Sequence, residues 1–515
     1  MRAWDAYTIK NEPISSLHLM NRAARVFTDW FMKRYPDTSQ AVLIVAGTGN
    51  NGGDGLAVAR MLDQAQYAAK VVVCDFGTRH SVDFEDQMTV FSAFSAVYPT
   101  VYKSFDAFQQ DNSVVFDGND LVIDALFGSG LTRPLEGDWA KLVGVLSNSG
   151  QEIISIDLPS GLYGDTPTPG DAVVRASATF TFQAPKRAFF FPENADFLGA
   201  WTIGDIGLHP DFEQQMETSS YYLTMDDAAS RWKPRKKFAH KGTFGHALIV
   251  AGSWGKMGAS VLAARACLRS GVGLLTVHSP RCGNIVLQTS VPEAMVSADR
   301  RAKYWTEVPD LAPFSSVGVG PGIGRAPETA EAVRLLLTGA NIPLVLDADA
   351  LNVLAEQPQW LELLPENSVL TPHPKEFDRL FGETTDGFHR NELQLSMAIR
   401  YRVFIVLKGA NTAIACPDGA CWFNSTGNPG MATGGSGDVL TGILTGLLAQ
   451  GYSPESTCLL GVLLHGLAGD LAASDLSQEA MTAGDLVEYI GKAWTTLDKK
   501  KKDLANAEFI PQTQP

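Results

Sequence analysis

The chain has 515 residues, 45% of them hydrophobic and 19% charged, which predicts a folded protein of two or three domains. Its formal net charge of −15 argues against a surface for nucleic acid or an anionic membrane. The N-terminal residues lack the apolar core of a secretory signal, and no uninterrupted apolar run approaches the roughly 18 residues of a membrane span. Six cysteines without a C-x-x-C pair suit a reducing compartment. We therefore expect a cytoplasmic protein with neither nucleic acid nor membrane as a partner.

The N-terminal half predicts alternating helices and buried strands. Apolar residues at helical spacing indicate a helix over residues 14–34, and the glycine-rich residues 47–55 lead into a second helix that ends near Leu62. Mainly apolar runs of strand length occur at 41–46, 70–75, 121–126, 153–157 and 178–182. Continuous rather than alternating apolar strands indicate a parallel sheet that helices cover on both faces.

The loop after the first strand allows two interpretations. Gly47, Gly49 and Gly52 give the pattern G-x-G-x-x-G between a strand and a helix, and Asp75 ends the next strand about 20 residues later, as in dinucleotide-binding Rossmann domains. However, the same loop carries Asn50, Asn51 and Asp54, which a loop that presents only amides does not need. Their oxygens could equally bind a cation or position a substrate.

Two later strand ends carry similar residues. Asp120 and Asp124 lie around one strand, which is followed by Gly128, Ser129 and Gly130. Asp157 ends the next strand and Ser160 follows it, without the G-x-S-x-G pattern of a hydrolase nucleophile. Ligands gather at the carboxyl ends of strands in an open parallel sheet, so we expect a site here.

A change of composition separates the two halves. Residues 207–241 are polar and then basic, which suggests an inter-domain connection, and the basic cluster is more typical of a solvated face than of a binding patch. A second strand–helix series follows, with strands expected at 246–253, 274–277, 317–319, 343–347, 368–371 and 403–407. We expect an N-terminal domain at 1–216, a linker at 217–240, a C-terminal domain at 241–500 and a frayed tail at 501–515.

The most informative stretch of the C-terminal half is residues 424–451. Its glycine-rich loop opens a helix with Asp438 in the first turn, and free backbone N–H groups at a helix start bind anions. An acid at that point suggests a base rather than a phosphate ligand, and the alternative is a simple N-cap. Gly442 and Gly446 would let this helix pack close to its neighbours.

Three further loops follow apolar strands. One is a second glycine-rich loop at 318–324, and one is a turn fixed by two prolines that presents His373, Lys375 and Glu376. The third begins with Lys408 and Gly409, a natural contact for phosphate. Together with the loop before Asp438, they resemble the ribokinase-like superfamily, in which an aspartate deprotonates the accepting hydroxyl.

Both halves together resemble one family, the bacterial bifunctional NAD(P)H-hydrate repair enzymes. Residues 47–55, 120–130 and 157–161 resemble the NAD(P)H-hydrate epimerase domain, and residues 371–376, 408–412 and 428–442 resemble the ADP-dependent NAD(P)H-hydrate dehydratase domain. The resemblance implies an α/β protein of two domains, the first a Rossmann-like parallel sheet with helices on both faces and the second a ribokinase-like domain.

For the C-terminal domain the resemblance implies an ADP-dependent elimination. Hydrated NADH or NADPH carries a hydroxyl at C6, which would be phosphorylated from ADP and then expelled as phosphate, leaving AMP. Asp438 would be the base on that hydroxyl and also contact the substrate, and Mg²⁺ would neutralise the phosphates. The remaining implied residues are Ala259, Gly322 and His373 in the hydrate pocket, and Lys408, Gly409, Ala410, Asn411, Thr412 and Gly437 on the nucleotide.

For the N-terminal domain the resemblance implies interconversion of the R and S forms at C6, because the dehydratase accepts only the S form. Asn51, Asp120 and Ser160 match the family's potassium ligands, and Asp157 is the candidate acid/base residue. The implied substrate contacts are Asn50, Asn51, Gly52, Gly53, Asp54, Asp124, Gly128, Ser129, Gly130 and Asp157.

An alternative stays open. The C-terminal half could be a ribokinase-like kinase for a vitamin or sugar, fused to a Rossmann-like module that only binds a ligand. The sequence leaves open whether the chain forms a homo-oligomer and whether NADH hydrate or NADPH hydrate is preferred.

Overall fold

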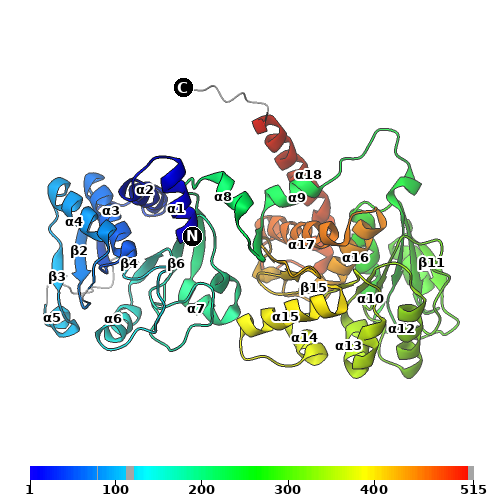
Figure 1. Ribbon diagram of the computed structural model, residues 1–515. Coiled ribbons are helices and arrows are strands. Elements are labelled where there is room, and N and C mark those ends of the chain that lie inside the picture. The colour runs from blue at the N-terminus through cyan, green and yellow to red at the C-terminus, as the bar shows by residue number, and fades with distance from the viewer. Residues whose placement is uncertain (78, 112–120, 509–515) are drawn as a thin grey trace. The chain divides into compact units, whose positions relative to one another are not determined.

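The computed structural model describes residues 1–77, 79–111 and 121–508, and the chain divides into two compact units, Met1–Glu217 and Thr218–Pro515. Each unit is an α/β fold built on its own sheet, with helices packed against the strands (Figure 1). The two-domain α/β organisation expected from the sequence is confirmed.

The first unit contains a sheet of seven strands in the order β3-β2-β1-β4-β5-β6-β7. Every pair of neighbours is parallel. The strands are β1 (Ala41–Ala46), β2 (Ala68–Cys74), β3 (Thr100–Tyr102), β4 (Leu121–Ala125), β5 (Glu152–Ile156), β6 (Ala178–Phe182) and β7 (Ala200–Gly204). The sequence identified five of them; β3 and β7 were missed because their residues are only partly buried and carry no apolar run.

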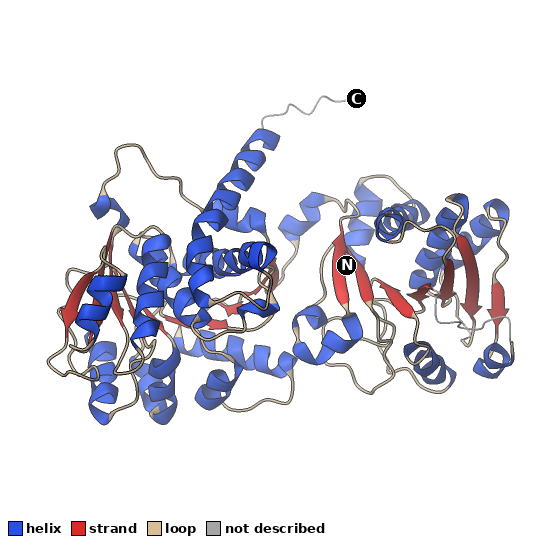
Figure 2. Cartoon of the chain, turned by 180° about the vertical axis from the view of Figure 1, so that it is seen from behind, coloured by secondary structure: helices blue, strands red, loops and turns tan. Residues whose placement is uncertain are grey.

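Helices cover both faces of this sheet, as Figure 2 shows. Along β1, Val42 and Ile44 pack into one core with the first helices, whereas Leu43 and Val45 pack into another on the opposite face. The helices are α1 (Arg2–Asn11), α2 (Ser16–Arg34), α3 (Asn50–Gln64), α4 (Val82–Phe94), α5 (Phe105–Gln110), α6 (Asp138–Ser147), α7 (Ala195–Leu198) and α8 (Pro210–Gln215), with short 3₁₀ turns at Arg187–Phe190 and Pro192–Asn194.

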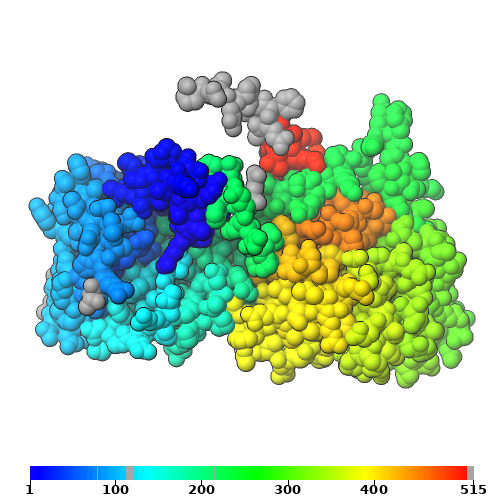
Figure 3. Space-filling model, in the orientation of Figure 1, coloured from blue at the N-terminus to red at the C-terminus, as the bar shows by residue number. Residues whose placement is uncertain are grey.

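The sequence predicted α2, which begins at Ser16 because the Ser15 side chain caps it, but not α1. Helix α1 has no clear apolar face, and long-range hydrogen bonds hold it. The Trp4 indole donates to the His209 carbonyl at 2.8 Å, and the Thr8 hydroxyl accepts from the His209 N–H at 2.9 Å. The space-filling view shows the N-terminal segment, in dark blue, at the surface of the first unit (Figure 3).

The second unit contains a ten-stranded sheet in the order β11-β10-β9-β12-β13-β14-β15-β16-β17-β8. All neighbours are parallel except at β16, which is antiparallel to both β15 and β17. The strands are β8 (Ser220–Leu223), β9 (His246–Val250), β10 (Leu274–Ser279), β11 (Met295–Ala298), β12 (Ser316–Val319), β13 (Leu344–Leu346), β14 (Val369–Leu370), β15 (Phe404–Leu407), β16 (Ala413–Ala415) and β17 (Cys421–Asn424). The six strands expected here are confirmed, whereas the antiparallel extension was not anticipated.

Helices again flank the sheet: α9 (Met225–Arg231), α10 (Met257–Arg269), α11 (Gly283–Ser290), α12 (Pro327–Gly339), α13 (Ala348–Glu356), α14 (Pro374–Phe381), α15 (Gly387–Tyr401), α16 (Ser436–Ala449), α17 (Pro454–Leu476) and α18 (Ala483–Glu508). Three 3₁₀ turns lie at Lys241–Phe244, Pro358–Leu363 and Pro429–Met431. The close approach of α16 to α10 depends on two glycines. A Cβ at Gly442 would lie 2.2 Å from the Ala263 carbonyl oxygen, and one at Gly446 would lie 2.0 Å from the Ser270 hydroxyl. The packing role expected for both glycines is confirmed.

Residues 217–240, expected as a linker, include ordered parts of the second unit. Strand β8 pairs with β17, and α9 packs against α17 and α18. Two of the basic side chains satisfy carbonyls just beyond helix ends: Arg235 donates to Gly271 after α10, and Lys233 donates to Gly451 after α16 at 3.5 Å. The basic segment therefore stabilises two helix ends rather than only facing solvent.

Two helices differ from the sequence expectation at the C-terminal end. Helix α18 continues to Glu508 and so covers part of the expected tail, and the rest of the tail lies outside the described residues. Helix α17 is long and apolar enough to cross a membrane, but 72% of its apolar window is buried inside the unit. Because core helices of water-soluble proteins share these properties, α17 is weak evidence for a membrane span.

Candidate functional sites

The first unit has a cavity of about 630 Å³ at the carboxyl ends of its strands. It brings together the expected residues from three loops: those after β1, β4 and β5. Those that line the cavity are Asn50, Asn51, Asp54, Gly128, Ser129, Gly130 and Asp157.

Three of the expected substrate contacts do not line this cavity. A Cβ at Gly52 would lie 1.9 Å from the Gly47 carbonyl oxygen, and one at Gly53 would lie 2.9 Å from the Met20 sulfur, so both glycines allow close packing of α3. Asp124 is fully buried behind the cavity, where its carboxylate accepts hydrogen bonds from Ser155, Ser160 and Leu126.

Asp157 is held rigidly at the end of β5. Its backbone has φ +65°, a left-handed conformation that is rare for a residue with a side chain, and the residue is 8% exposed. Oδ1 accepts from the Lys186 ammonium at 2.5 Å and from the Thr181 hydroxyl at 3.3 Å, while Oδ2 accepts from the Ser129 N–H at 3.2 Å. Burial raises the pKa of Asp157, but the Lys186 charge and these hydrogen bonds outweigh it and lower the pKa. Asp157 is therefore a carboxylate at neutral pH.

Asp54 lies in the opposite electrostatic environment. Burial raises its pKa well above the ordinary value, and the nearby charges of Asp157, Asp5 and Asp83 raise it further. A cavity with one carboxylate held ionised and another favoured in the protonated form suits proton transfer in both directions.

Two of the three expected potassium ligands are described, and Asp120 lies outside the described residues. The Ser160 hydroxyl donates to Asp124 at 2.6 Å and accepts from the Phe127 N–H at 2.8 Å. The buried amide nitrogen of Asn51 has no hydrogen-bond partner within the described residues. Because an amide side chain can be turned over, an oxygen in its place could ligate a cation.

The alternative dinucleotide site around Asp75 is not supported by the geometry. The Asp75 carboxylate already accepts from Lys103 and lies 3.1 Å from the His80 ring, and it is 6% exposed. In this conformation the Asp75 carboxylate is therefore not available to bind a ribose hydroxyl.

In the second unit, Asp438 is not the N-cap of α16. Gly435 occupies that position with φ +94°, and Asp438 is the third residue of the helix. Within the described residues, the Asp438 carboxylate accepts no hydrogen bond. Burial, with the charges of Asp347 and Asp349, raises the pKa of Asp438 to about 7, against the opposing effect of Lys408. A carboxyl group with such a pKa is suited to general-base catalysis near neutral pH.

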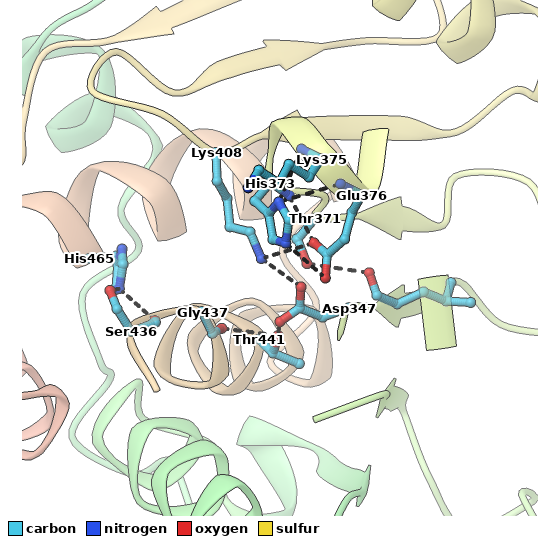
Figure 4. A network of polar contacts seen from close by, with 11 residues as sticks. Asp347, Thr371, His373, Lys375, Glu376, Lys408, Ser436, Gly437, Thr441 and His465 are labelled. Atoms are coloured by element: carbon cyan, nitrogen blue, oxygen red, sulfur yellow. Dashed lines mark hydrogen bonds and ion pairs between the residues drawn. The ribbon is translucent and has the colours of Figure 1, made fainter. Parts of the chain in front are cut away.

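A network of charged side chains lies beside the start of α16 (Figure 4). Lys408, directly after β15, donates to Asp347 Oδ1 at 2.7 Å, and the Thr441 hydroxyl of α16 donates to Asp347 Oδ2 at 2.9 Å. A Cβ at Gly437 would lie 3.2 Å from the Lys408 ammonium. The lysine and the first-turn amides of α16 therefore face one place, which suits an anion.

His373 caps α14 and is held in one orientation. Its Nδ1 accepts from the N–H groups of Lys375 and Glu376, while Glu376 accepts from the His373 N–H at 2.9 Å (Figure 4). Burial lowers the pKa of His373, so the imidazole is neutral at neutral pH and leaves Nε2 as its N–H donor. The same side chain thus caps α14 through Nδ1 and places Nε2 3.6 Å from Glu376 Oε1.

The other expected residues lie in two loops. Gly322 has φ +65°, and a Cβ there would lie 3.2 Å from the Ala259 Cβ, so these two are neighbours. In the loop between β15 and β16, Gly409 and Ala410 are exposed, and the Thr412 hydroxyl donates to the Gly409 carbonyl at 3.2 Å. Asn411 belongs to the same loop.

Comparison with known proteins assigns both units. The family described as YjeF-related protein N-terminus matches residues 16–188, and the family described as NAD(P)H-hydrate dehydratase matches residues 247–492. A bifunctional NAD(P)H-hydrate repair enzyme of Moorella thermoacetica is 35% identical over 91% of this chain and 90% of its own length. The chain belongs to this family. A second member, from Coxiella burnetii, is 33% identical over 93% of this chain and 94% of its own length.

Among solved structures, the chain is similar to the ADP/ATP-dependent NAD(P)H-hydrate dehydratase of Bacillus subtilis, co-crystallised with ATP and Mg²⁺. It shares 30% identity with a TM-score of 0.47, and the match covers 55% of this chain and all of that one.

Several residues of both sites were not predicted from the sequence. Lys186 follows β6 by a few residues, and Asp347 comes directly after β13, so the position after a strand was an available signal for each. Nothing local marked His465 of α17, whose ring lies 3.0 Å from the Ser436 carbonyl oxygen at the start of α16 (Figure 4). Burial lowers the pKa of His465 to about 4, so it is a neutral partner of that loop.

Proposed function

We propose that the chain repairs hydrated NADH and NADPH in two steps: the first unit interconverts the R and S forms, and the second converts the S form to NAD(P)H with ADP. The observation that carries the proposal is Asp438, a carboxyl group with a pKa of about 7 at the start of a glycine-led helix beside Lys408. The membership of both units in one repair family supports it.

In the dehydratase site, Asp438 would take the proton of the C6 hydroxyl. The hydroxyl oxygen then bonds to the β-phosphorus of ADP, and the bond between that phosphorus and AMP breaks. Phosphate is a better leaving group than hydroxide, so the C6–O bond can break next, and loss of a proton from C5 restores the ring double bond. Lys408, Gly437 and the loop with Gly409, Ala410, Asn411 and Thr412 would hold the phosphates of ADP. Ala259, Gly322 and the His373 donor would position the nicotinamide.

Mg²⁺ fits this site as an ion carried mainly by the nucleotide, whose phosphate charge it would neutralise. Within the described residues, no group of three His, Cys, Asp or Glu side chains could hold a metal ion. Mg²⁺ bound with a nucleotide takes most of its ligands from phosphates and water.

In the epimerase site, Asp157 would act as the acid/base residue, and Asn50, Asp54 and the 128–130 turn would hold the substrate. K⁺ is supported by the donor chemistry, since Asn51 lines the cavity with an amide side chain and the Ser160 hydroxyl lies against the buried Asp124 carboxylate. A bound cation would fix the loops after β1, β4 and β5 relative to one another.

The rival for the second unit is a kinase that uses ATP on a vitamin or sugar. To separate the two, the protein is incubated with the S form of hydrated NADH and either ADP or ATP, and nucleotide products are separated by chromatography. We expect one AMP and one phosphate for each NADH formed from ADP. Formation of a stable phosphorylated product without NADH would contradict the repair function.

We propose that the protein acts in the cytoplasm and that the reaction requires only small molecules as partners. All six cysteines are free thiols and five of them are buried, which suits a reducing compartment.

A further inference from the structure

The two oxygens of the Asp157 carboxylate have different surroundings. Oδ1 is held from behind by Lys186 and Thr181, which are themselves joined at 2.6 Å. Oδ2 accepts from the Ser129 N–H, the Ser129 side chain also hydrogen-bonds the carboxylate, and a Cβ at Gly128 would lie 3.3 Å from Oδ2. Because Gly128 and Ser129 both line the cavity, Oδ2 is the oxygen that a bound substrate meets.

Lys186 has no ligand-facing role of its own. It is 5% exposed, and its ammonium donates to Asp157, Thr181 and the Phe182 carbonyl at 2.5, 2.6 and 3.4 Å. An ammonium group has three donors, so all of them are used inside the protein. The lysine can therefore act on the substrate only through Asp157.

Asp54 faces the same cavity from a different element. It lies one turn after Asn50 and Asn51 on α3, and all three line the cavity with Asp157. No hydrogen bond to the Asp54 carboxyl occurs within the described residues. Asp54 is thus a cavity-lining carboxyl group without a hydrogen-bond partner among the described residues, whereas Lys186 holds the carboxylate of Asp157 in the same cavity.

We propose that Asp54 is the second proton-transfer residue of the epimerase site, acting with Asp157, and that Lys186 is a positioning residue that keeps Asp157 ionised with Oδ2 turned to the cavity. This inference rests on the epimerase function proposed above and names the groups that perform it.

The pair balances the chemistry of epimerisation at C6. Carbon C6 carries both the hydroxyl and ring nitrogen N1, so Asp157 Oδ2 takes the hydroxyl proton while the C6–N1 bond breaks. Its electron pair goes to N1, which takes a proton from Asp54, and C6 becomes an aldehyde carbon. Rotation and re-closure on the other carbonyl face, with both protons returned, give the other epimer. No oxidant or reductant is needed.

The charges that face the pair come from several elements. Lys186 approaches from the segment after β6, Asp5 and Arg2 from α1, Asp83 from α4, and Arg133 from the segment after β4. The charges of Asp157, Asp5 and Asp83 favour the protonated form of Asp54. The Lys186 charge favours the ionised form of Asp157. The epimerisation rate should therefore be bell-shaped in pH, with Asp157 on the acid limb and Asp54 on the alkaline limb.

The test uses the full-length chain without ADP, so that only epimerisation occurs, and follows the appearance of the R form from pure S-NADH hydrate by chromatography across pH. We expect Lys186→Met to move the acid limb to higher pH and lower kcat at neutral pH by at least about tenfold, and Lys186→Arg to restore the wild-type profile. Asp54→Asn should lower kcat by roughly 10²- to 10⁴-fold with little change in KM and abolish the alkaline limb.

Lys103→Met is the matched control, because Lys103 is an exposed lysine that pairs with a carboxylate, Asp75, outside the cavity. It should match the wild type, and calorimetric unfolding of the first unit reports that each variant is folded. An unshifted acid limb in Lys186→Met, or a kcat within about twofold of wild type in Asp54→Asn, would overturn this inference alone. A wild-type chain that does not interconvert the epimers faster than buffer would instead overturn the proposed epimerase function.

Discussion

Replacing Asp438 with asparagine separates the two explanations for an acidic residue in the first turn of α16. A catalytic base must be ionised to act, whereas an acid that only favours the start of the helix would stabilise the fold through its charge. The substitution keeps the shape of the side chain and removes its charge. We expect dehydration of the S form to fall by at least about 10²-fold while ADP affinity stays near that of the wild type.

The pKa of Asp438 gives the size of the effects. With a pKa of about 7, about one-tenth of the side chains are ionised one pH unit below that value and about nine-tenths one unit above it. The wild-type rate should therefore rise nearly tenfold between about pH 6 and pH 8.

The same raised pKa means that the ionised side chain destabilises the fold. Because the folded-state pKa lies above the ordinary 3.8, stability falls as the pH rises from about 4 to about 7 and stays reduced above that. The difference between the two pKa values limits this destabilisation to about 4 kcal/mol, and we expect a loss of about 2 kcal/mol because the carboxyl is partly exposed. Asp438→Asn should thus raise the Tm of the second unit by about 4 °C at pH 8, and by less than half of that near pH 5.

The assay is calorimetric unfolding of the ligand-free protein at both pH values, with Asp485→Asn as the matched control. Asp485 is also the third residue of its helix, but it accepts from the Thr482 N–H at 2.9 Å and from the Thr482 hydroxyl at 2.7 Å, which lowers its pKa. The control should lose stability at pH 8. If Asp438→Asn loses stability there as well, the charge of Asp438 stabilises the start of α16 and its assignment as a base is wrong.

Three further predictions follow from the contacts. Lys408→Met should destabilise the second unit by about 3 kcal/mol and weaken ADP binding, because it leaves the buried Asp347 carboxylate without its cation; denaturant unfolding and ADP titration measure both. Gly442→Ala should lower the free energy of unfolding of the second unit by about 1–3 kcal/mol, because its Cβ would overlap the Ala263 carbonyl, and should reduce dehydration but not epimerisation. The control is Gly491→Ala on α18, where a Cβ meets no atom within 4 Å, and it should not lower the free energy of unfolding. Asp157→Ala should stop consumption of the R form in the ADP-coupled assay and leave consumption of the S form intact, and equal loss of both would argue against separate sites.

The parts of the fold that the sequence predicted are those with a strong local signal. Buried parallel strands such as β1 and β9 read as continuous apolar runs, and their carboxyl ends must meet at one edge of a sheet. For that reason Asn51, Gly128 and Asp157 could be placed in one site before the structure was known. Elements with mixed burial, such as β7, carry no comparable pattern.

Residues that act through distant partners could not be predicted in the same way. Lys186 meets Asp157 only because β5 and β6 are neighbours in the sheet, and His465 meets Ser436 only because α17 packs against α16. Conversely, Asp124 stands at a strand end like Asp157, but its side chain turns into the protein, where Ser155 and Ser160 satisfy it. The local sequence does not determine which of two such acids faces the cavity.

The most direct measurement of the central claim starts from the pure R form of hydrated NADH. The protein is supplied with ADP and Mg²⁺, and the absorbance of reduced nicotinamide is followed to completion. We predict full recovery of NADH, because the first unit must convert R to S before the second unit can act. Recovery of the S form but not of the R form would contradict the epimerase assignment, and ADP-dependent recovery of neither would contradict the repair function as a whole.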